Sequence, residues 1–258
     1  MEKYALPAPE MLIQQAEWLA PARGRLLRQV GIARRKRVLD LGAGYGAVTG
    51  ELVRRAGGAV VALDCAVAAL RAEAGAFDGA YRIGGEALHL PFADGTFDLV
   101  FAQLTLLWVR PVTGAVREIA RVLAKDGAFV ALEPDYGGLI EYPPEIATRE
   151  LWMNGLTRAG ADPLIGRKLP GLLAMHGFRV NVGLFDTLYA PSTVRFDFLR
   201  ELPLNVEETA ALARIEREAL GHQDPWAQIA HLPFFLITAV KPVINHQAQK
   251  AQARSSGP

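Results

Sequence analysis

Short apolar runs alternate with amphipathic segments along the first half of the chain. The apolar runs, which are typical of buried parallel strands, lie at 38–41, 59–63, 80–84, 97–103 and 128–132. Segments with helical periodicity separate several of them, at 47–55, 66–75 and 112–123. Strands that alternate with helices require a parallel sheet covered on both faces. The pattern therefore predicts an α/β fold with a doubly wound sheet.

The pattern before and after this core predicts additional elements. Two helices are expected at 9–20 and 22–30, separated by Pro21. They either cover a sheet edge or form a lid over the site that follows the first strand. After Asp135 the alternation stops, and we expect a helix at 166–176, a strand at 178–188, helices within 191–226 and a last strand at 233–240.

This reading divides the chain into three parts. Residues 1–36 form an N-terminal helical cover, and residues 241–258 form a polar tail that we expect to be disordered. Residues 37–240 form a single domain with insertions near 135–165 and 190–230. Gly127, after the helix at 112–123, is expected to end that helix with a positive φ.

Composition narrows the class of protein. Net charge is +1 and charged residues make up 21% of the chain, so nothing favours a polyanionic partner such as nucleic acid. The N-terminus lacks a signal-peptide pattern, and the longest apolar runs, such as 234–240, are too short to span a membrane. A single cysteine excludes an internal disulfide and fits a reducing compartment. We therefore expect a cytoplasmic protein.

The strongest chemical signal is a glycine-rich turn directly after the first predicted strand. Gly42, Gly44 and Gly46 lack a Cβ, so the chain can turn sharply and bring backbone N–H groups close to a ligand. The same residues satisfy a dinucleotide pattern and an Asp-x-Gly-x-Gly-x-Gly pattern. The glycines alone therefore leave open a nicotinamide cofactor and S-adenosylmethionine.

Acidic residues at or after the ends of three successive predicted strands favour S-adenosylmethionine. Asp40 would lie near the pyrophosphate of a dinucleotide, an unfavourable contact, but it suits a ligand that carries an ammonium and a sulfonium. Asp64 stands about 20 residues after the first glycine, where an acid binds ribose hydroxyls. Its alternative role is a helix N-cap. Glu86 and Ala87, after the third strand, can contact an adenine edge.

From about 37 to 134 the sequence resembles the class I S-adenosylmethionine-dependent methyltransferases. The likeness is to the small-molecule branch (methyltransferase type 11), typified by the ubiquinone and menaquinone biosynthesis enzymes. It rests on the glycine turn, the run GEALHLPFADGTFDLVFA at 85–102, the run RVLAKDGAFVALEP at 121–134 and the closing FFLITAVK at 234–241. The resemblance implies a Rossmann-like, seven-stranded sheet of order 3-2-1-4-5-7-6 in which strand seven is antiparallel.

The resemblance also implies a set of S-adenosylmethionine-binding residues. Asp64 would take the ribose hydroxyls, Cys65 would lie beside the adenine, and Gln103 and Leu104 would flank the donor methyl. Glu86 departs from the family, which often has Asp there. The adenine edge would contact Glu86 and Ala87. The methionine half would contact Asp40, Gly42, Ala43, Gly44 and Gly46.

Methyl transfer from a sulfonium is an in-line displacement that needs alignment but no metal. Candidate bases or orienters follow the fifth strand, namely Glu133, Asp135 and Tyr136. Apolar and aromatic residues in the insertions favour a small, partly apolar acceptor. The motifs of nucleic-acid base methylation are missing after strand four. A binding module without turnover and an NAD-dependent oxidoreductase remain as alternatives.

Overall fold

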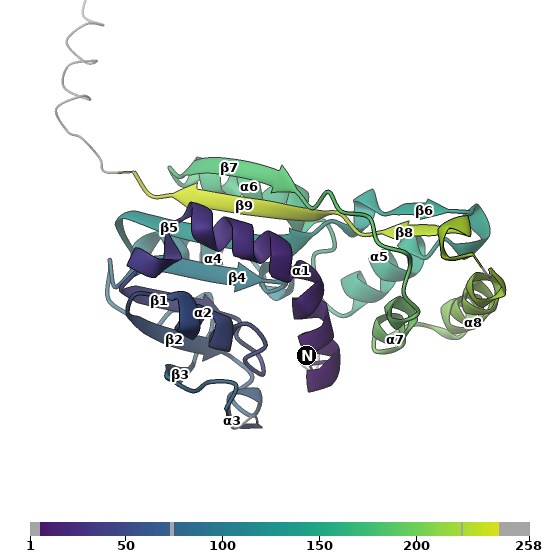
Figure 1. The fold of residues 1–258 in the computed structure, drawn as a ribbon, viewed down its shortest axis with the longest axis horizontal. Helices are drawn as coiled ribbons and strands as arrows, with labels where there is room; N and C mark the ends of the chain where they lie inside the picture. The colour runs from purple at the N-terminus through teal and green to yellow at the C-terminus, as the bar shows by residue number, and fades with distance from the viewer. Residues whose placement is uncertain (1–5, 73–74, 223, 243–258) are drawn as a thin grey trace, which may run out of the picture.

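The computed structural model describes residues 6–72, 75–222 and 224–242, and the tail predicted after 241 lies almost wholly outside these residues. Its main feature is one seven-stranded sheet (Figure 1). The first five strands are parallel, and β9 runs antiparallel to both of its neighbours. The strand order is β3 (Ala80–Gly84), β2 (Ala59–Asp64), β1 (Arg37–Leu41), β4 (Phe97–Gln103), β5 (Leu123–Pro134), β9 (Phe234–Val240) and β7 (Arg179–Leu184). The predicted fold class and strand order are confirmed.

Helices cover the two faces of this sheet because side chains alternate along each strand. On one face, Val38 and Phe101 pack in a core with α1 (Pro9–Gln29) and α2 (Thr49–Arg55). On the other face, Leu39 and Val100 pack in a core with α4 (Val112–Val122) and α6 (Ile165–Met175). The short α3 (Ala69–Ala72) lies beside β3.

Pro21 does not divide the N-terminal segment, contrary to the prediction. The segment is one helix of 21 residues. A proline leaves the carbonyl four residues earlier without its helical N–H partner, which usually kinks or ends a helix. Pro21 and Glu17 are both exposed, so water can satisfy that carbonyl. The apolar residues on the opposite side of the helix keep it on the sheet.

The predicted end of α4 at Gly127 is also wrong. The helix ends at Val122 and the chain continues directly into β5. The residue with positive φ is Asp126, at 57°. Gly127 is required for space instead, because a Cβ there would lie 2.7 Å from the carbonyl oxygen of Ala124.

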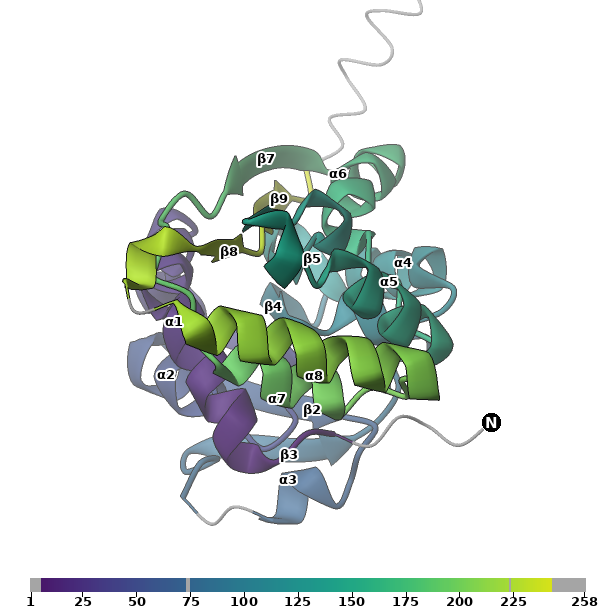
Figure 2. The same cartoon turned by 90° about the vertical axis from the view of Figure 1, so that its right-hand side faces the viewer.

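The insertions lie beyond the carboxyl ends of the parallel strands, as Figures 1 and 2 show. The antiparallel pair of β6 (Ile140–Tyr142) and β8 (Ile229–His231) was not predicted, and the strand expected at 178–188 is the shorter β7. Short 3-10 turns join the larger elements, at η1 (Ile32–Arg34), η2 (Leu106–Trp108), η3 (Tyr136–Gly138), η4 (Pro144–Ile146) and η5 (Pro225–Ala227). The inserted elements are β6 (Ile140–Tyr142), α5 (Arg149–Arg158), α7 (Val194–Arg200), α8 (Val206–Gly221) and β8 (Ile229–His231). Within the described residues, no helix has the length and apolar character to cross a membrane.

Candidate cofactor site

The glycine turn follows β1 and uses all three of its glycines in the left-handed region. The φ angles of Gly42, Gly44 and Gly46 are 78°, 52° and 83°. A Cβ on Gly42 would lie 2.3 Å from the side chain of Thr105, and one on Gly46 would lie 2.9 Å from Phe77. Conformation and space therefore both require glycine at these two positions.

The turn is bound to the end of β2. The N–H groups of Gly42 and Ala43 donate to the carbonyl oxygen of Leu63 at 2.8 and 3.1 Å, and the N–H of Gly44 donates to Asp64 Oδ2 at 2.8 Å. The expectation that these N–H groups are directed at a ligand is therefore wrong for these three groups.

Two buried carboxylates lie at the ends of β1 and β2. Asp40 is 3% exposed and Asp64 is 8% exposed. Thr49 Oγ1 donates to Asp40 Oδ2 at 2.6 Å, and the N–H of Ala66 donates to Asp64 Oδ1 at 2.7 Å. Burial, with a smaller contribution from the charge of nearby Asp64, raises the pKa of the Asp40 carboxyl to about 6 against the lowering effects of Thr49 and Arg23.

Arg23 of α1 is a part of this region that the sequence analysis missed. Its guanidinium is buried, with the residue 4% exposed. It donates to Glu51 Oε2 from Nε at 2.8 Å, to Gln103 Oε1 at 3.0 Å and to the carbonyl oxygen of Ala16 at 2.8 Å. In the sequence, Arg23 stands on the apolar face of the N-terminal helical segment, in line with Leu19 and Leu27, and this position could have indicated a buried arginine.

These bonds engage the side chain of Gln103, which was predicted to flank the donor methyl. They also connect α1 to β4 and α2. Leu6 and Leu12 approach to 3.9 Å from the position of a Cβ on Gly44, so the start of α1 lies beside the glycine turn. The helix thus packs on the sheet and also borders the predicted site.

The residues predicted to contact the nucleoside lie together at the ends of β2 and β3. The N–H of Gly85 donates to the carbonyl oxygen of Asp64 at 3.0 Å, which joins the two loops. Cys65 and Glu86 are exposed and Ala87 is half-buried. Glu86 forms a backbone bridge with His89. The structure therefore brings these residues to one edge next to Asp64.

A strained turn follows β4. Leu104 has a φ of 54°, which is uncommon for a residue other than glycine. Thr105 Oγ1 donates to the carbonyl oxygen of Leu41 at 3.1 Å, which connects this turn to the glycine turn. The turn continues into η2.

The three candidate catalytic residues at the end of β5 have different environments. Glu133 is 0% exposed, its Oε2 has no partner among the described residues, and burial raises its pKa to about 7. Asp135 is held by Arg167, whose Nη2 lies 2.6 Å from Asp135 Oδ2. The ring of Tyr136 packs on Trp152, with centroids 4.8 Å apart.

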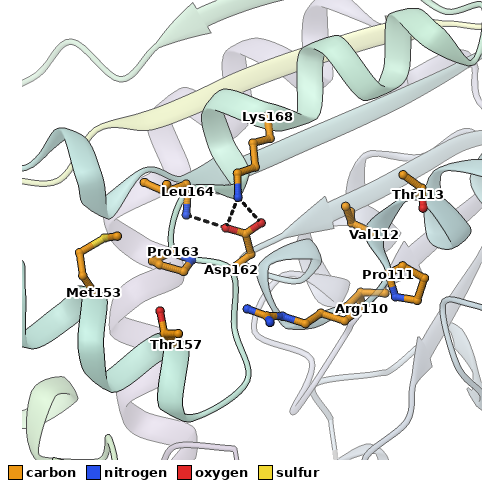
Figure 3. Close-up of a pocket in the computed structure, with 11 residues that line it drawn as sticks. Arg110, Pro111, Val112, Thr113, Met153, Thr157, Asp162, Pro163, Leu164 and Lys168 are labelled. Carbon is orange, nitrogen blue, oxygen red and sulfur yellow. Dashed lines mark hydrogen bonds and ion pairs between the residues drawn. The ribbon is translucent and has the colours of Figure 1, made fainter.

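A hollow of about 730 Å³ lies elsewhere, between α4, α5 and the start of α6 (Figure 3). None of the predicted cofactor residues lines it. Its charged side chains are satisfied within the chain: Asp162 accepts from Lys168 at 2.8 Å, and Arg110 donates to the carbonyl oxygen of Ala161. The hollow is bordered by the segment that follows η2, and it is separate from the glycine turn.

The site suits a cationic nucleoside better than a dinucleotide. Asp64 lies close enough to Asp40 for its charge to raise the pKa of Asp40, so acidic groups gather at this end of the sheet. A pyrophosphate would add like charge there, whereas an ammonium and a sulfonium would oppose it. Each Asp64 oxygen accepts one backbone N–H and retains a further lone pair for a ribose hydroxyl.

Known proteins resemble this chain in sequence, most of all over the segment that contains the candidate site. Residues 39–131 match a family model described as a methyltransferase domain. A demethylmenaquinone methyltransferase from Thermobifida fusca is 43% identical over 101 residues, which cover 37% of this chain and 42% of that protein. A mouse protein named arginine-hydroxylase NDUFAF5, mitochondrial, is 35% identical over 189 residues, covering 72% of this chain and 54% of that protein.

The fold has close counterparts among solved structures. The YcgJ protein from Bacillus subtilis superposes with a TM-score of 0.63 at 18% identity, covering 85% of this chain and 97% of that one. This likeness concerns the fold, whereas the family model and the similar sequences confirm the resemblance to class I S-adenosylmethionine-dependent methyltransferases over residues 39–131. The chain spans less than half the length of the demethylmenaquinone methyltransferase that it matches.

Proposed function

We propose that this protein transfers a methyl group from S-adenosylmethionine to a small, partly apolar acceptor. The observation that carries the proposal is the pair of buried carboxylates, Asp40 and Asp64, beside a glycine turn with positive φ at three positions. This arrangement lies inside the segment that matches the methyltransferase family.

The residues that would hold the cofactor come from the ends of β1, β2, β3 and β4. The bound cofactor supplies an activated methyl on a sulfonium. The chain's own contribution is to bind the cation, orient it and exclude water. Asp64 and Glu86 would bind the nucleoside beside Cys65 and Ala87. The methionine half would lie against Asp40 and the glycine turn (Gly42, Ala43, Gly44, Gly46), and Gln103 and Leu104 would flank the methyl.

The acceptor would enter from the side of the insertions. Phe198 of α7 is buried in the core cluster against which Met11 of α1 and Leu104 pack, and Trp18 contacts Phe198 with ring centroids 6.2 Å apart. An apolar lining of this kind favours an acceptor with an apolar part. The name of the Thermobifida relative, a demethylmenaquinone methyltransferase, is consistent with an acceptor of this kind.

We propose that Asp135 and Tyr136 act on transfer from the acceptor side of the site, whereas the fully buried Glu133 acts through the turn after β4, whose N–H groups it accepts. Asp135 is engaged by Arg167, so its role is to fix the start of η3. Tyr136 is the candidate for contact with the acceptor. The single, exposed Cys65 fits a reducing compartment, and we place the reaction in the cytoplasm.

Calorimetric titration tests the proposal directly. We expect S-adenosylmethionine and S-adenosylhomocysteine to bind and NAD to show no heat of binding. Incubation with a methyl-labelled donor and a panel of quinols, phenols and carboxylic acids should then transfer label to one class. Binding of NAD alone would overturn the proposal in favour of an oxidoreductase, and binding of the donor without label transfer across the panel would favour a binding module.

A further inference from the structure

The turn that follows β4 begins with a residue other than glycine in an unfavourable backbone conformation. Leu104 has a left-handed φ of 54°, a conformation that brings the Cβ of an L-residue too close to the following carbonyl. An ordinary residue keeps such a conformation only where surrounding contacts impose it.

One side chain supplies much of that constraint. Glu133 Oε1 accepts the N–H of Thr105 at 3.1 Å and the N–H of Leu106 at 2.8 Å. The backbone N–H of Leu107 also acts on this carboxylate and lowers its pKa. The carboxylate thus binds the first N–H groups of η2, directly after the left-handed residue.

The side chain of Glu133 lies on the face of the sheet opposite to that of Asp40. Leu132 belongs to the core under α1, whereas Ala131 belongs to the core under α4 and α6 together with Leu106. Because side chains alternate along a strand, Glu133 shares the face of Ala131. Asp40 lies on the opposite face, next to Thr49 of α2.

We infer that Glu133 is a positioning residue that holds the turn from Leu104 to Leu106 in its ligand-binding conformation through two backbone hydrogen bonds. It therefore acts on the donor through the turn and does not remove a proton from the acceptor. The inference rests on the proposed function, because it assigns the turn to the donor site.

Substitutions separate this role from a general loss of packing. Glu133→Leu removes the acceptor oxygen, whereas Glu133→Gln keeps an oxygen that can accept the same N–H groups. Asp98 gives a matched control, because its carboxylate accepts the N–H groups of Lys36 at 2.7 Å and Arg37 at 3.1 Å at the opposite end of β4. Asp98→Leu should therefore disturb the same strand without reaching the turn.

The measurements are the Kd for S-adenosylmethionine by calorimetry and the hydrogen exchange of the Thr105 and Leu106 amides. In Glu133→Leu we expect Kd to rise about 10-fold or more and the exchange of both amides to accelerate by a similar factor. In Glu133→Gln both should stay within about 3-fold of wild type, and in Asp98→Leu they should be unchanged. Should Glu133→Leu fail to fold, Glu133→Asp withdraws the acceptor by one methylene and gives the same comparison.

Wild-type Kd and wild-type amide exchange in folded Glu133→Leu would overturn the inference. An equal rise of Kd and of the exchange rates in Glu133→Gln and Glu133→Leu would also overturn it, because the effect would then depend on the charge and not on the acceptor oxygen. Failure of the proposed function is distinguishable. If the wild-type protein does not bind the donor, the exchange rates still report whether Glu133 holds the turn.

Discussion

At the scale of single residues, Asp64 has two roles at once. It binds the glycine turn through Gly44 and also accepts the N–H of Ala66 in the connection to α3. The predicted helix N-cap is not formed, because α3 begins only at Ala69, and the ribose role stays a prediction. A carboxylate held by two backbone N–H groups is also pre-organised for a ligand hydroxyl.

Asp64→Ala should weaken binding of S-adenosylhomocysteine by about 1.5–3 kcal/mol, because hydrogen bonds to a charged acceptor are lost. Calorimetry measures the change. Asp94→Ala is the control, since that carboxylate is exposed, pairs with Arg121 and precedes the start of β4, whereas the site lies at the end of that strand. An unchanged affinity in Asp64→Ala would refute the ribose assignment.

Gly42→Ala should destabilise the protein through two separate effects. The positive φ of 78° costs about 1–2 kcal/mol with a Cβ, and the 2.3 Å approach to Thr105 adds about 1–3 kcal/mol. Gly160→Ala isolates the first effect, because its φ is 88° and a Cβ there meets nothing within 4 Å. Urea unfolding of both variants gives the difference, and equal losses would show that Thr105 moves aside freely.

At the scale of elements, the positions of strands β1 to β5 were predictable from the sequence pattern, the order of the strands followed from the family resemblance, and the polar connections between elements were not predicted. Strands β1 to β5 are apolar runs bounded by turn residues, so local pattern suffices. Strand β6 has three residues and pairs with β8, which lies about 90 residues later, so no local signal indicates it. The glycine turn and its acids were predictable because they directly follow strands, whereas the contacts of Arg23 with Glu51 and Gln103 depend on long-range packing.

Arg23→Met tests how strongly α1 is coupled to the site. The change keeps most of the side chain's apolar length but leaves Gln103 and part of Glu51 without their donor, and breaking a buried pair costs about 3 kcal/mol. Arg25→Met, at an exposed pair 3.8 Å from Asp186, should cost less than about 1 kcal/mol. Chemical denaturation compares the two. Equal losses would mean that the buried contacts of Arg23 contribute no more than a surface pair.

At the scale of the whole molecule, the sheet places its acids at the carboxyl ends and the insertions cover that end (Figure 2). Two of the acids are buried with raised pKa values, Asp40 to about 6 and Glu133 to about 7. Glu118 and Glu208 are shifted the other way, each to about 2, by their arginine partners. The two groups of acids therefore change their contribution to stability in different pH ranges.

The stability of the ligand-free protein should fall as pH rises from about 4.5 to 7. A carboxyl whose pKa is raised by folding contributes most below its unfolded value, 3.8 for Asp40 and 4.5 for Glu133, and the contribution is lost through its folded value. The expected loss is a few kcal/mol at roughly 1.4 kcal/mol per pKa unit. Glu118 and Glu208 weaken the fold only as pH falls below 4.5, so they leave this window clear.

Unfolding free energies at pH 5 and pH 8 measure this loss, which should shrink in Asp40→Asn and in Glu133→Gln. The donor should reverse part of it, because a sulfonium near Asp40 favours the charged carboxylate. Stabilisation by S-adenosylmethionine should therefore grow from pH 5 to pH 8 more than stabilisation by S-adenosylhomocysteine, whose sulfur is neutral. Asp40→Asn should abolish that difference. The same difference in Asp40→Asn as in wild type would place the sulfonium away from this carboxylate.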